Sequence, residues 1–416
     1  MTFMDFKVDL TAEQLTLKHT VRDFSSSILR PAAIKLDKMK PEEVIKSNLY
    51  WDTIKQAKEM GYHTAFIPEN YGGLGLSPIE LQIFFEELAY GSAGFAVALG
   101  VDTFPATVAS LIDSDMLNRE IIEPYVNNTD GSFIGCWAIT EPNHGSDWLM
   151  NLTNKPENKM SFKATTTAEF KGDHWLINGA KAAWVSNGPV ATHALLFVHI
   201  IRDKKITGGG IAICPLDLQG ISRGKPLDKL GQRELVQGEL YFDNVELPTE
   251  FMVFEEDMFP TMGKTVLAYA NAVMGAMFTG VARAAFEEAL KYTGERIQGN
   301  KKLNQHQNVQ SKLFNMYMEI EATRALSRNV LEYNLQTMPP ITRYSIISKV
   351  FSTETAYKTA HEAITLFGGA GISKEYYIEK LFRDTRVALI EDGSNDVLGL
   401  TAINELLREN RELYMS

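Results

Sequence analysis

The most constraining feature of this 416-residue chain is a hydrophobic pattern that changes twice along its length. Up to about residue 128, apolar residues recur three and four positions apart, which is the spacing of one helix face. The next stretch has short alternating runs broken by Gly, Asp and Asn, with a hairpin turn expected at Gly172-Asp173. Helical periodicity returns after Pro248 and continues to the C-terminus. We therefore expect an α+β fold with a helical N-terminal domain at 1–128, a small central β domain at 129–250 and a helical C-terminal domain at 251–416.

Local signals predict several helix boundaries. Thr11 and Gln14 have the spacing of a capping box, in which each side chain bonds the backbone of the other residue. Ser77-Pro78-Ile79-Glu80 predicts a second start, because Ser can cap, Pro fits the first turn and Glu reaches back. Pro339-Pro340 predicts a turn between two helices of the C-terminal domain.

Composition argues against several classes of function. A formal net charge of −11 disfavours a nucleic-acid surface, which needs clustered basic residues. The two cysteines, Cys136 and Cys214, have neither metal-site nor redox spacing and fit a reducing compartment. Residues 1–9 lack a targeting pattern, so we expect a cytoplasmic protein. Residues 265–282 are uncharged, but polar and glycine residues within them favour a buried core helix over a membrane span.

Three stretches of the chain carry the residues of a cofactor site. The first is Trp137-Ala138-Ile139-Thr140-Glu141-Pro142-Asn143-His144-Gly145-Ser146-Asp147, and the second is Trp184-Val185-Ser186-Asn187-Gly188. The third runs from Phe367 to Val397 and contains Gly368-Gly369-Ala370-Gly371, whose bare backbone can approach a pyrophosphate closely. In this order the three stretches resemble the signatures of the acyl-CoA dehydrogenase family. The resemblance covers nearly the whole chain and includes Glu86-Glu87-Leu88-Ala89 and Arg383-Asp384-Thr385-Arg386.

The resemblance implies FAD as cofactor, with a C-terminal four-helix bundle and a central β-barrel or sandwich. It assigns one group of residues to the flavin within a subunit: Trp137, Ile139, Thr140, Gly145, Ser146, Trp184, Ser186, Ser394 and Asp396. It assigns a second group to the FAD of a neighbouring subunit: Arg296, Gln307, Gly368 and Gly369. Without the family, Arg296 and Gln307 would be interpreted as solvated helix residues. The stretch from Gly179 to Trp184 is one residue longer than the family pattern, so we expect a bulge or a reshaped turn there.

The catalytic base is expected within Glu391-Asp392. Family members place a Glu six residues after the second Arg of Arg-Asp-x-Arg, and here this count gives Asp392. We therefore prefer Asp392, with Glu391 as the alternative. The resemblance also assigns substrate contacts to Ser146, Gly393 and Asn271. Asn271 stands where the family commonly has an Arg that helps hold the carrier arm of the thioester.

The activity implied is α,β-dehydrogenation of an acyl-CoA thioester to the trans-2-enoyl-CoA. A carboxylate takes the α-proton, and the β-hydrogen leaves as hydride to flavin N5. A homotetramer is implied, with an electron-transfer flavoprotein as a possible partner. Three alternatives remain open: a dehydrogenase or oxidase of a group on a carrier protein, a flavin monooxygenase, and a non-catalytic flavin-binding scaffold.

Overall fold

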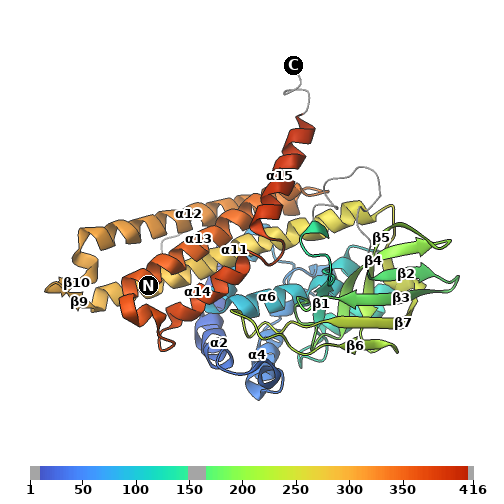
Figure 1. The fold of residues 1–416 in the computed structure, drawn as a ribbon, viewed down its shortest axis with the longest axis horizontal. Coiled ribbons are helices and arrows are strands. Elements are labelled where there is room, and N and C mark those ends of the chain that lie inside the picture. The colour runs from blue at the N-terminus through green and yellow to red at the C-terminus, as the bar shows by residue number, and fades with distance from the viewer. Residues whose placement is uncertain (1–9, 149–164, 411–416) are drawn as a thin grey trace.

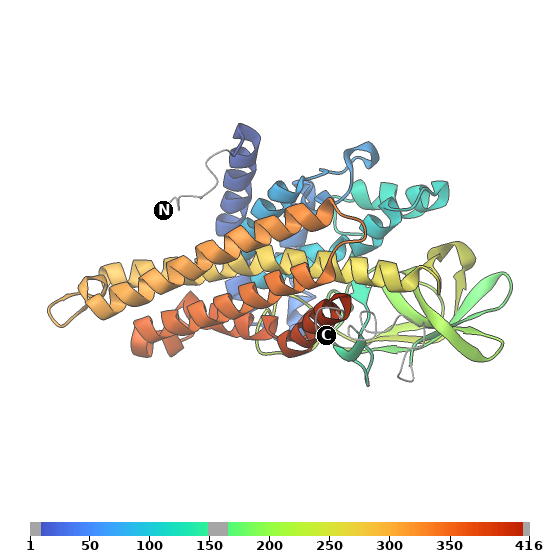
Figure 2. The ribbon, with the colours of Figure 1, turned by 90° about the horizontal axis from the view of Figure 1, so that it is seen from above.

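The computed structural model describes residues 10–148 and 165–410. Residues 1–9, on which the expected cytoplasmic location was based, lie outside the described residues. The long C-terminal helices run along the molecule, and the β-sheet lies beyond one end of them (Figure 1). The N-terminal helices pack against the middle of these long helices, as the perpendicular view also shows (Figure 2). The order helical, β, helical agrees with the hydrophobic pattern.

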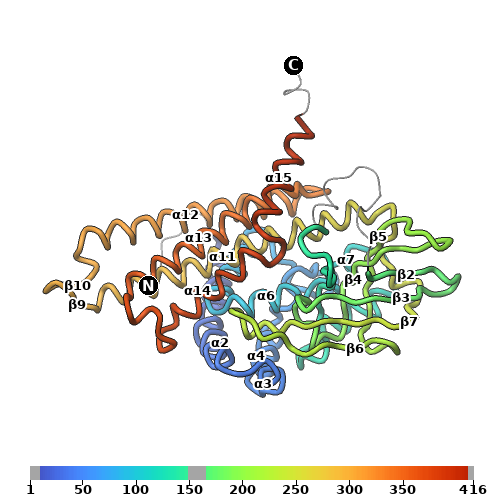
Figure 3. Tube along the Cα trace, viewed as in Figure 1, coloured from blue at the N-terminus to red at the C-terminus, as the bar shows by residue number. Residues whose placement is uncertain are grey.

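The N-terminal domain consists of helices. Their bounds are α1 (Ala12–Phe24), α2 (Arg30–Leu36), α3 (Pro41–Val44), α4 (Asn48–Glu59), α5 (Pro78–Gly91), α6 (Ala93–Asp102), α7 (Phe104–Ser110), α8 (Asp115–Leu117) and α9 (Glu123–Val126). Both expected starts are confirmed: Thr11 and Gln14 form a capping box, and the Ser77 N–H donates to Glu80. Helix α7 packs on strands of the sheet (Figure 3), which brings the N-terminal domain to the edge of the β domain.

The central domain is one twisted sheet. Its strands are β1 (Gly135–Ala138), β2 (Thr167–Phe170), β3 (His174–Lys181), β4 (His193–Arg202), β5 (Lys205–Pro215), β6 (Ile221–Arg223), β7 (Leu240–Pro248) and β8 (Met252–Phe254). They are ordered β6-β7-β3-β2-β4-β5-β8, with β1 pairing in parallel with β4. The hairpin at Gly172-Asp173 is confirmed, because β2 and β3 pair antiparallel across it. The register shift between Ile177 and Gly179 places the extra residue on β7, and β3 pairs regularly from Gly179 to Lys181. The longer stretch is accommodated instead by the turn after β3, where the N–H of Val185 donates to Ala182 O at 3.3 Å.

The C-terminal domain is a bundle of long helices. Its elements are α11 (Phe259–Glu295), the two short strands β9 (Ile297–Gln298) and β10 (Lys301–Lys302), α12 (Gln307–Leu335), α13 (Thr342–Phe367), α14 (Tyr377–Ala388) and α15 (Asn395–Glu409). Helix α11 is long and apolar enough to cross a membrane, but 94% of its most apolar window is buried inside the protein. It is the central core helix, as expected, and Pro339-Pro340 lies in the turn between α12 and α13.

Buried ion pairs join the N-terminal domain to the bundle. Glu86 and Glu87 of α5 pair with Arg283 of α11 at 2.7 Å and 2.6 Å. Glu86 also pairs with Arg324 of α12 at 3.0 Å. Removing one member would leave an uncompensated buried charge, which is strongly destabilising. The Glu-Glu-Leu-Ala motif therefore fixes α5 against the bundle, and α6, which follows α5, is held in place by the same contact.

Candidate active site

A cavity of about 600 Å³ lies where the β domain meets the C-terminal domain. Residues of the first two motifs line one side, and residues of α14 and the segment after it line the other. The sequence-predicted residues that line it are Trp137, Ile139, Thr140, Gly145, Ser146, Trp184, Ser186, Glu391, Asp392 and Gly393. The fold thus brings together side chains that lie more than two hundred residues apart in the chain.

A buried ion pair supports the β-domain wall of this cavity. Lys181 Nζ donates to Ile139 O and to Glu141 Oε1, both at 3.0 Å. Glu141 also accepts hydrogen bonds from Thr165 and Thr166. Burial would raise the pKa of Glu141, but Lys181 and these donors hold it at about 2, so the carboxylate stays charged. Lys181, on the buried side of the cavity wall, therefore holds the backbone at Ile139 in place.

Trp184 presents an open aromatic face in the cavity. Trp184 is 59% exposed, although Val185 next to it is buried. Gln237 Nε2 donates to the backbone oxygen of Trp184 at 3.2 Å and to Ser186 Oγ at 3.0 Å. Asn187 Nδ2 then ties the loop to Ala98 O and Gly135 O at 2.9 Å and 3.1 Å. A rigid loop thus holds an aromatic platform and a hydroxyl side by side.

The opposite wall is the segment Glu391–Ser394 between α14 and α15, which we call the base loop. Asp392 and Gly393 adopt left-handed backbone conformations, with φ of 51° and 96°. The N–H of Ser394 donates to Ser146 Oγ at 3.0 Å, which links this loop to the β domain. Ser146 therefore contacts the base loop directly.

Both carboxyl groups of the base loop have pKa values suited to proton transfer near neutral pH. Burial raises the pKa of Asp392 to about 6, against the opposing effect of the Lys349 cation. Burial and the charge of Asp392 raise the pKa of Glu391 to about 7. Gln232 Nε2 donates to Glu391 Oε1 at 2.6 Å, so one oxygen of Glu391 is already engaged within the protein.

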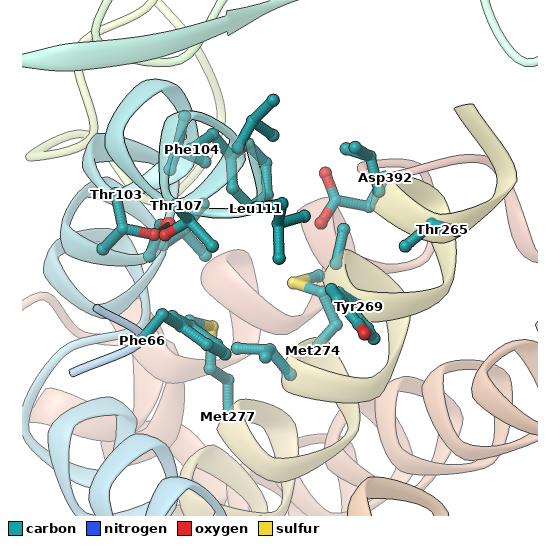
Figure 4. A pocket seen from close by; sticks show the side chains of 17 residues that line it. Phe66, Thr103, Phe104, Thr107, Leu111, Thr265, Tyr269, Met274, Met277 and Asp392 are labelled. Carbon is teal, nitrogen blue, oxygen red and sulfur yellow. Dashed lines mark hydrogen bonds between the residues drawn. The ribbon is translucent and has the colours of Figure 1, made fainter. Parts of the chain in front are cut away.

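A second, smaller pocket of about 50 Å³ opens beside the first between α6, α7 and α11 (Figure 4). Its lining is almost wholly apolar and includes Phe66, Phe104, Tyr269, Met274 and Met277. Val97, Val101 and Asp392 line both spaces. Asp392 is the only carboxylate among the described residues that line the small pocket. It stands at the junction of the polar cavity and the apolar pocket, whereas Glu391 lines the larger cavity alone.

The second group of predicted cofactor residues lies elsewhere. Arg296 and Gln307 flank the β9–β10 turn, and Gly368 and Gly369 follow α13; all four are exposed. Tyr292 of α11 stacks on Phe367, which brings the end of α11 next to these glycines. This end of the bundle points away from the β domain (Figures 1 and 2). The structure therefore gathers these four residues at one place but separates them from the 600 Å³ cavity.

The structure places the remaining predicted residues as follows. Asp396 is exposed on α15. Asn271 is fully buried in α11, where its Nδ2 donates to the backbone oxygen of Asp392 at 3.2 Å. The expected contact of Asn271 with a carrier arm stays a prediction, and within the chain its side chain is directed to the base loop. Gly393 lines the cavity, and its carbonyl accepts from Lys349 Nζ at 2.8 Å.

Sequence reasoning missed four polar residues around the site: Gln232, Gln237, Lys229 and Lys349. Lys229 Nζ donates to Gln237 Oε1 at 2.9 Å, and both residues line the cavity. Lys349 is fully buried in α13. Its helical position, four residues after Ser345 and three before Ser352, placed it on the buried face, but no motif marked it.

Comparisons with known proteins agree over the whole fold. Models of the N-terminal, middle and C-terminal domains of acyl-CoA dehydrogenase match residues 11–113, 136–245 and 259–407. The short-chain specific acyl-CoA dehydrogenase of Rattus norvegicus is 29% identical over 97% of this chain and 92% of its own length. Benzylmalonyl-CoA dehydrogenase of Aromatoleum aromaticum is 31% identical over 97% of this chain and 100% of its own. The solved structure of butyryl-CoA dehydrogenase from Megasphaera elsdenii superposes with a TM-score of 0.84 at 28% identity, covering 97% and 100% of the two chains.

Proposed function

Because the chain belongs to the acyl-CoA dehydrogenase family, we propose that it catalyses FAD-dependent α,β-dehydrogenation of an acyl-CoA thioester. The product is the trans-2-enoyl-CoA. The observation that carries the proposal is the position of Asp392, which lines both the large cavity and the apolar pocket. A base at that junction reaches a carbon that lies between a cofactor on one side and an acyl chain on the other.

The residues of the larger cavity fit a flavin ring. Trp184 offers an exposed aromatic face, and an added Cβ at Gly145 would meet no atom within 4 Å, so the backbone there is open to a ligand. The buried Nε1 of Trp137 has no partner among the described residues and is an available donor. Thr140, Ser146 and Ser186 supply further polar groups. When bound there, FAD would accept the β-hydrogen as hydride.

The end of the bundle that lies away from the β domain has residues suited to the diphosphate part of an FAD whose flavin ring is held by another subunit. Arg296 supplies a guanidinium suited to phosphate, and added Cβ atoms at Gly368 and Gly369 would meet nothing within 4 Å. Because these residues are separated from the cavity within one chain, we propose that each FAD is held by two chains. This proposal requires at least a dimer, and the family resemblance extends it to a homotetramer with one FAD per chain.

In the proposed mechanism, Asp392 removes the α-proton of the thioester. A free aspartate is a weak base, and the raised pKa of about 6 makes Asp392 a stronger one while leaving it ionised at neutral pH. The backbone N–H of Asp392 would donate to the thioester carbonyl and stabilise the negative charge that develops there. Val97, Val101 and the apolar pocket exclude water from the reacting carbons.

The apolar pocket supports a short acyl chain as substrate. An apolar cavity of about 150 Å³ binds benzene, and this pocket measures about 50 Å³. It therefore has room for a few methylene groups but not for an aromatic ring in this conformation. Curated relatives named as short-chain specific agree with this proposal.

A carrier-protein substrate has less support than it had from the sequence. The sequence offered two reasons for it, Asn271 and the extra acid Glu391, and both side chains bond within the protein, to the backbone oxygen of Asp392 and to Gln232. We therefore propose CoA as the carrier. An electron-transfer flavoprotein is proposed as the electron acceptor, and cytoplasmic location stays a prediction.

Anaerobic titration of the purified protein with a panel of acyl-CoA thioesters tests the function. Bleaching of the flavin absorbance by butyryl-CoA or hexanoyl-CoA, and not by long-chain or aryl thioesters, is the expected result. A carrier-protein thioester that bleaches the flavin when the CoA ester does not would replace the proposed substrate. A protein that cannot take up FAD at all would be a scaffold and not a dehydrogenase.

A further inference from the structure

The base loop has a backbone conformation that it would not adopt by itself. Asp392 has a φ of 51°, in the left-handed region that residues other than glycine rarely occupy. Such a conformation persists only where surrounding contacts impose it. The direction of the Asp392 carboxylate, and therefore its access to the junction of the two pockets, depends on those contacts.

Three separate parts of the fold hold the base loop. Asn271 of α11 donates its Nδ2 to the backbone oxygen of Asp392 at 3.2 Å. Lys349 of α13 donates its Nζ to the backbone oxygen of Gly393 at 2.8 Å and to Asn395 Oδ1 at 2.7 Å. Ser146 of the β domain accepts the N–H of Ser394 at 3.0 Å. Consecutive backbone groups are thus fixed from three directions.

The Asn271 and Lys349 side chains are costly in purely structural terms. Both are fully buried. The Oδ1 of Asn271 finds no partner among the described residues, so a single hydrogen bond holds this buried amide. The Lys349 ammonium donates to a carbonyl and an amide oxygen, and its charge acts on the carboxyl groups of the base loop, Glu391 and Asp392. Buried polar groups with incomplete partners reduce stability, so a contribution to the site explains them better than a contribution to folding.

We propose that Asn271 and Lys349 are positioning residues that hold Asp392 in its left-handed conformation and direct its carboxylate to the junction of the two pockets. This inference rests on the proposed role of Asp392 as the base. It gives Asn271 a role beyond the carrier-arm contact expected for it, and it gives the chain its own means of placing an aspartate, which is one methylene shorter than the glutamate of the family.

Asn271→Ala removes the donor to Asp392 and leaves the carboxylate itself unchanged. The limiting rate of flavin reduction by a short-chain thioester should fall about 10- to 100-fold, because a displacement of about 1 Å at a reacting group has effects of this size. The dissociation constant of the thioester and the flavin content should stay close to those of the wild type. This split between rate and binding is not expected from general destabilisation.

Asn334→Ala is the matched control. Asn334 is equally buried and bonds the turn between α12 and α13, with its Nδ2 2.7 Å from Ser345 Oγ and its Oδ1 3.0 Å from Ile341 N. This variant should unfold at a lower temperature and reduce its flavin at the wild-type rate. Lys349→Met should slow reduction as Asn271→Ala does, and Lys349→Arg should retain more of the rate because it keeps a cationic donor.

Hydrogen exchange provides a readout that needs no turnover. Peptides covering residues 389–397 should take up deuterium faster in Asn271→Ala and Lys349→Met than in the wild type or in Asn334→Ala. Wild-type exchange in this segment for both variants, or wild-type reduction rates for both, would overturn the inference. If the wild type itself is not reduced by any thioester, the proposed function fails, while the exchange experiment still decides whether these residues hold the loop.

Discussion

Met277 offers the sharpest test of the proposal that the small apolar pocket holds the acyl chain. It lies on α11, lines that pocket and is 3% exposed. Gly100 of α6 faces it, and a Cβ added at Gly100 would lie 2.9 Å from Met277 Cε. The tip of Met277 therefore limits the pocket on this side, and the two residues can be changed to widen it or to narrow it.

Met277→Ala removes about three non-hydrogen atoms, which makes room for about two further methylene groups of an acyl chain. Burying each methylene is worth about 0.8 kcal/mol, so the total of about 1.6 kcal/mol corresponds to a change of about 15-fold. We expect the ratio of kcat/KM for hexanoyl-CoA over butyryl-CoA to rise by about this factor. Gly100→Ala should change the ratio in the opposite direction, because the added methyl pushes Met277 Cε into the pocket.

The assay compares substrates on one enzyme preparation, so any loss of folded protein cancels from the ratio. This matters because truncating a buried methionine costs about 2 to 5 kcal/mol of stability. Met262→Ala is the matched control: Met262 lies on the same helix and is equally buried, but it does not line the pocket. An unchanged ratio in both Met277→Ala and Gly100→Ala would refute the assignment of the pocket to the acyl chain, as would an equal shift in Met262→Ala.

Two further predictions concern the cofactor and the base. Arg296→Ala should weaken FAD retention and the oligomer together, because a ligand bound only by the assembled state stabilises that state. Size-exclusion chromatography with flavin absorbance measures both quantities. A wild-type monomer that holds FAD as well as the oligomer does would contradict this prediction. The rate of flavin reduction should fall as the pH drops through about 6, because Asp392, whose pKa burial raises, must be ionised to accept a proton. Lys349→Met removes the cation that opposes this pKa shift, so the rate of flavin reduction should begin to fall at higher pH in the variant than in the wild type. Stopped-flow reduction across pH 5 to 9 measures the two pH profiles. A flat profile in the wild type would argue against a carboxylate base.

The parts of this fold that depend on local patterns were predictable from the sequence. Apolar spacing gave the order of helical and β segments, and the capping boxes at Thr11 and Ser77 marked true helix starts. Each of these depends on neighbours in the chain, which a single sequence displays.

The supports of the base loop were not predictable in this way. Asn271, Lys349 and Gln232 reach the loop from α11, α13 and the segment before β7, and each contact spans more than forty residues. Periodicity shows only that such residues face the core, and it does not show what they contact there. The second cofactor group, with Arg296 and Gly368, was predicted as a set, and its members are exposed together at one end of the bundle. The site that this group is proposed to complete belongs to a second chain, so it is not formed within one chain.

The most direct test of the central claim compares two neighbouring carboxylates. Asp392→Asn keeps the shape of the side chain and removes the proton acceptor, while Glu391→Gln does the same one residue earlier. In anaerobic stopped-flow with a short-chain acyl-CoA, we expect Asp392→Asn to slow flavin reduction by about 10²- to 10⁴-fold with thioester binding retained. Glu391→Gln should have a much smaller effect, because Glu391 bonds Gln232 and does not line the apolar pocket. Near-wild-type reduction in Asp392→Asn together with a large loss in Glu391→Gln would assign the base to Glu391 and contradict the account given of the site.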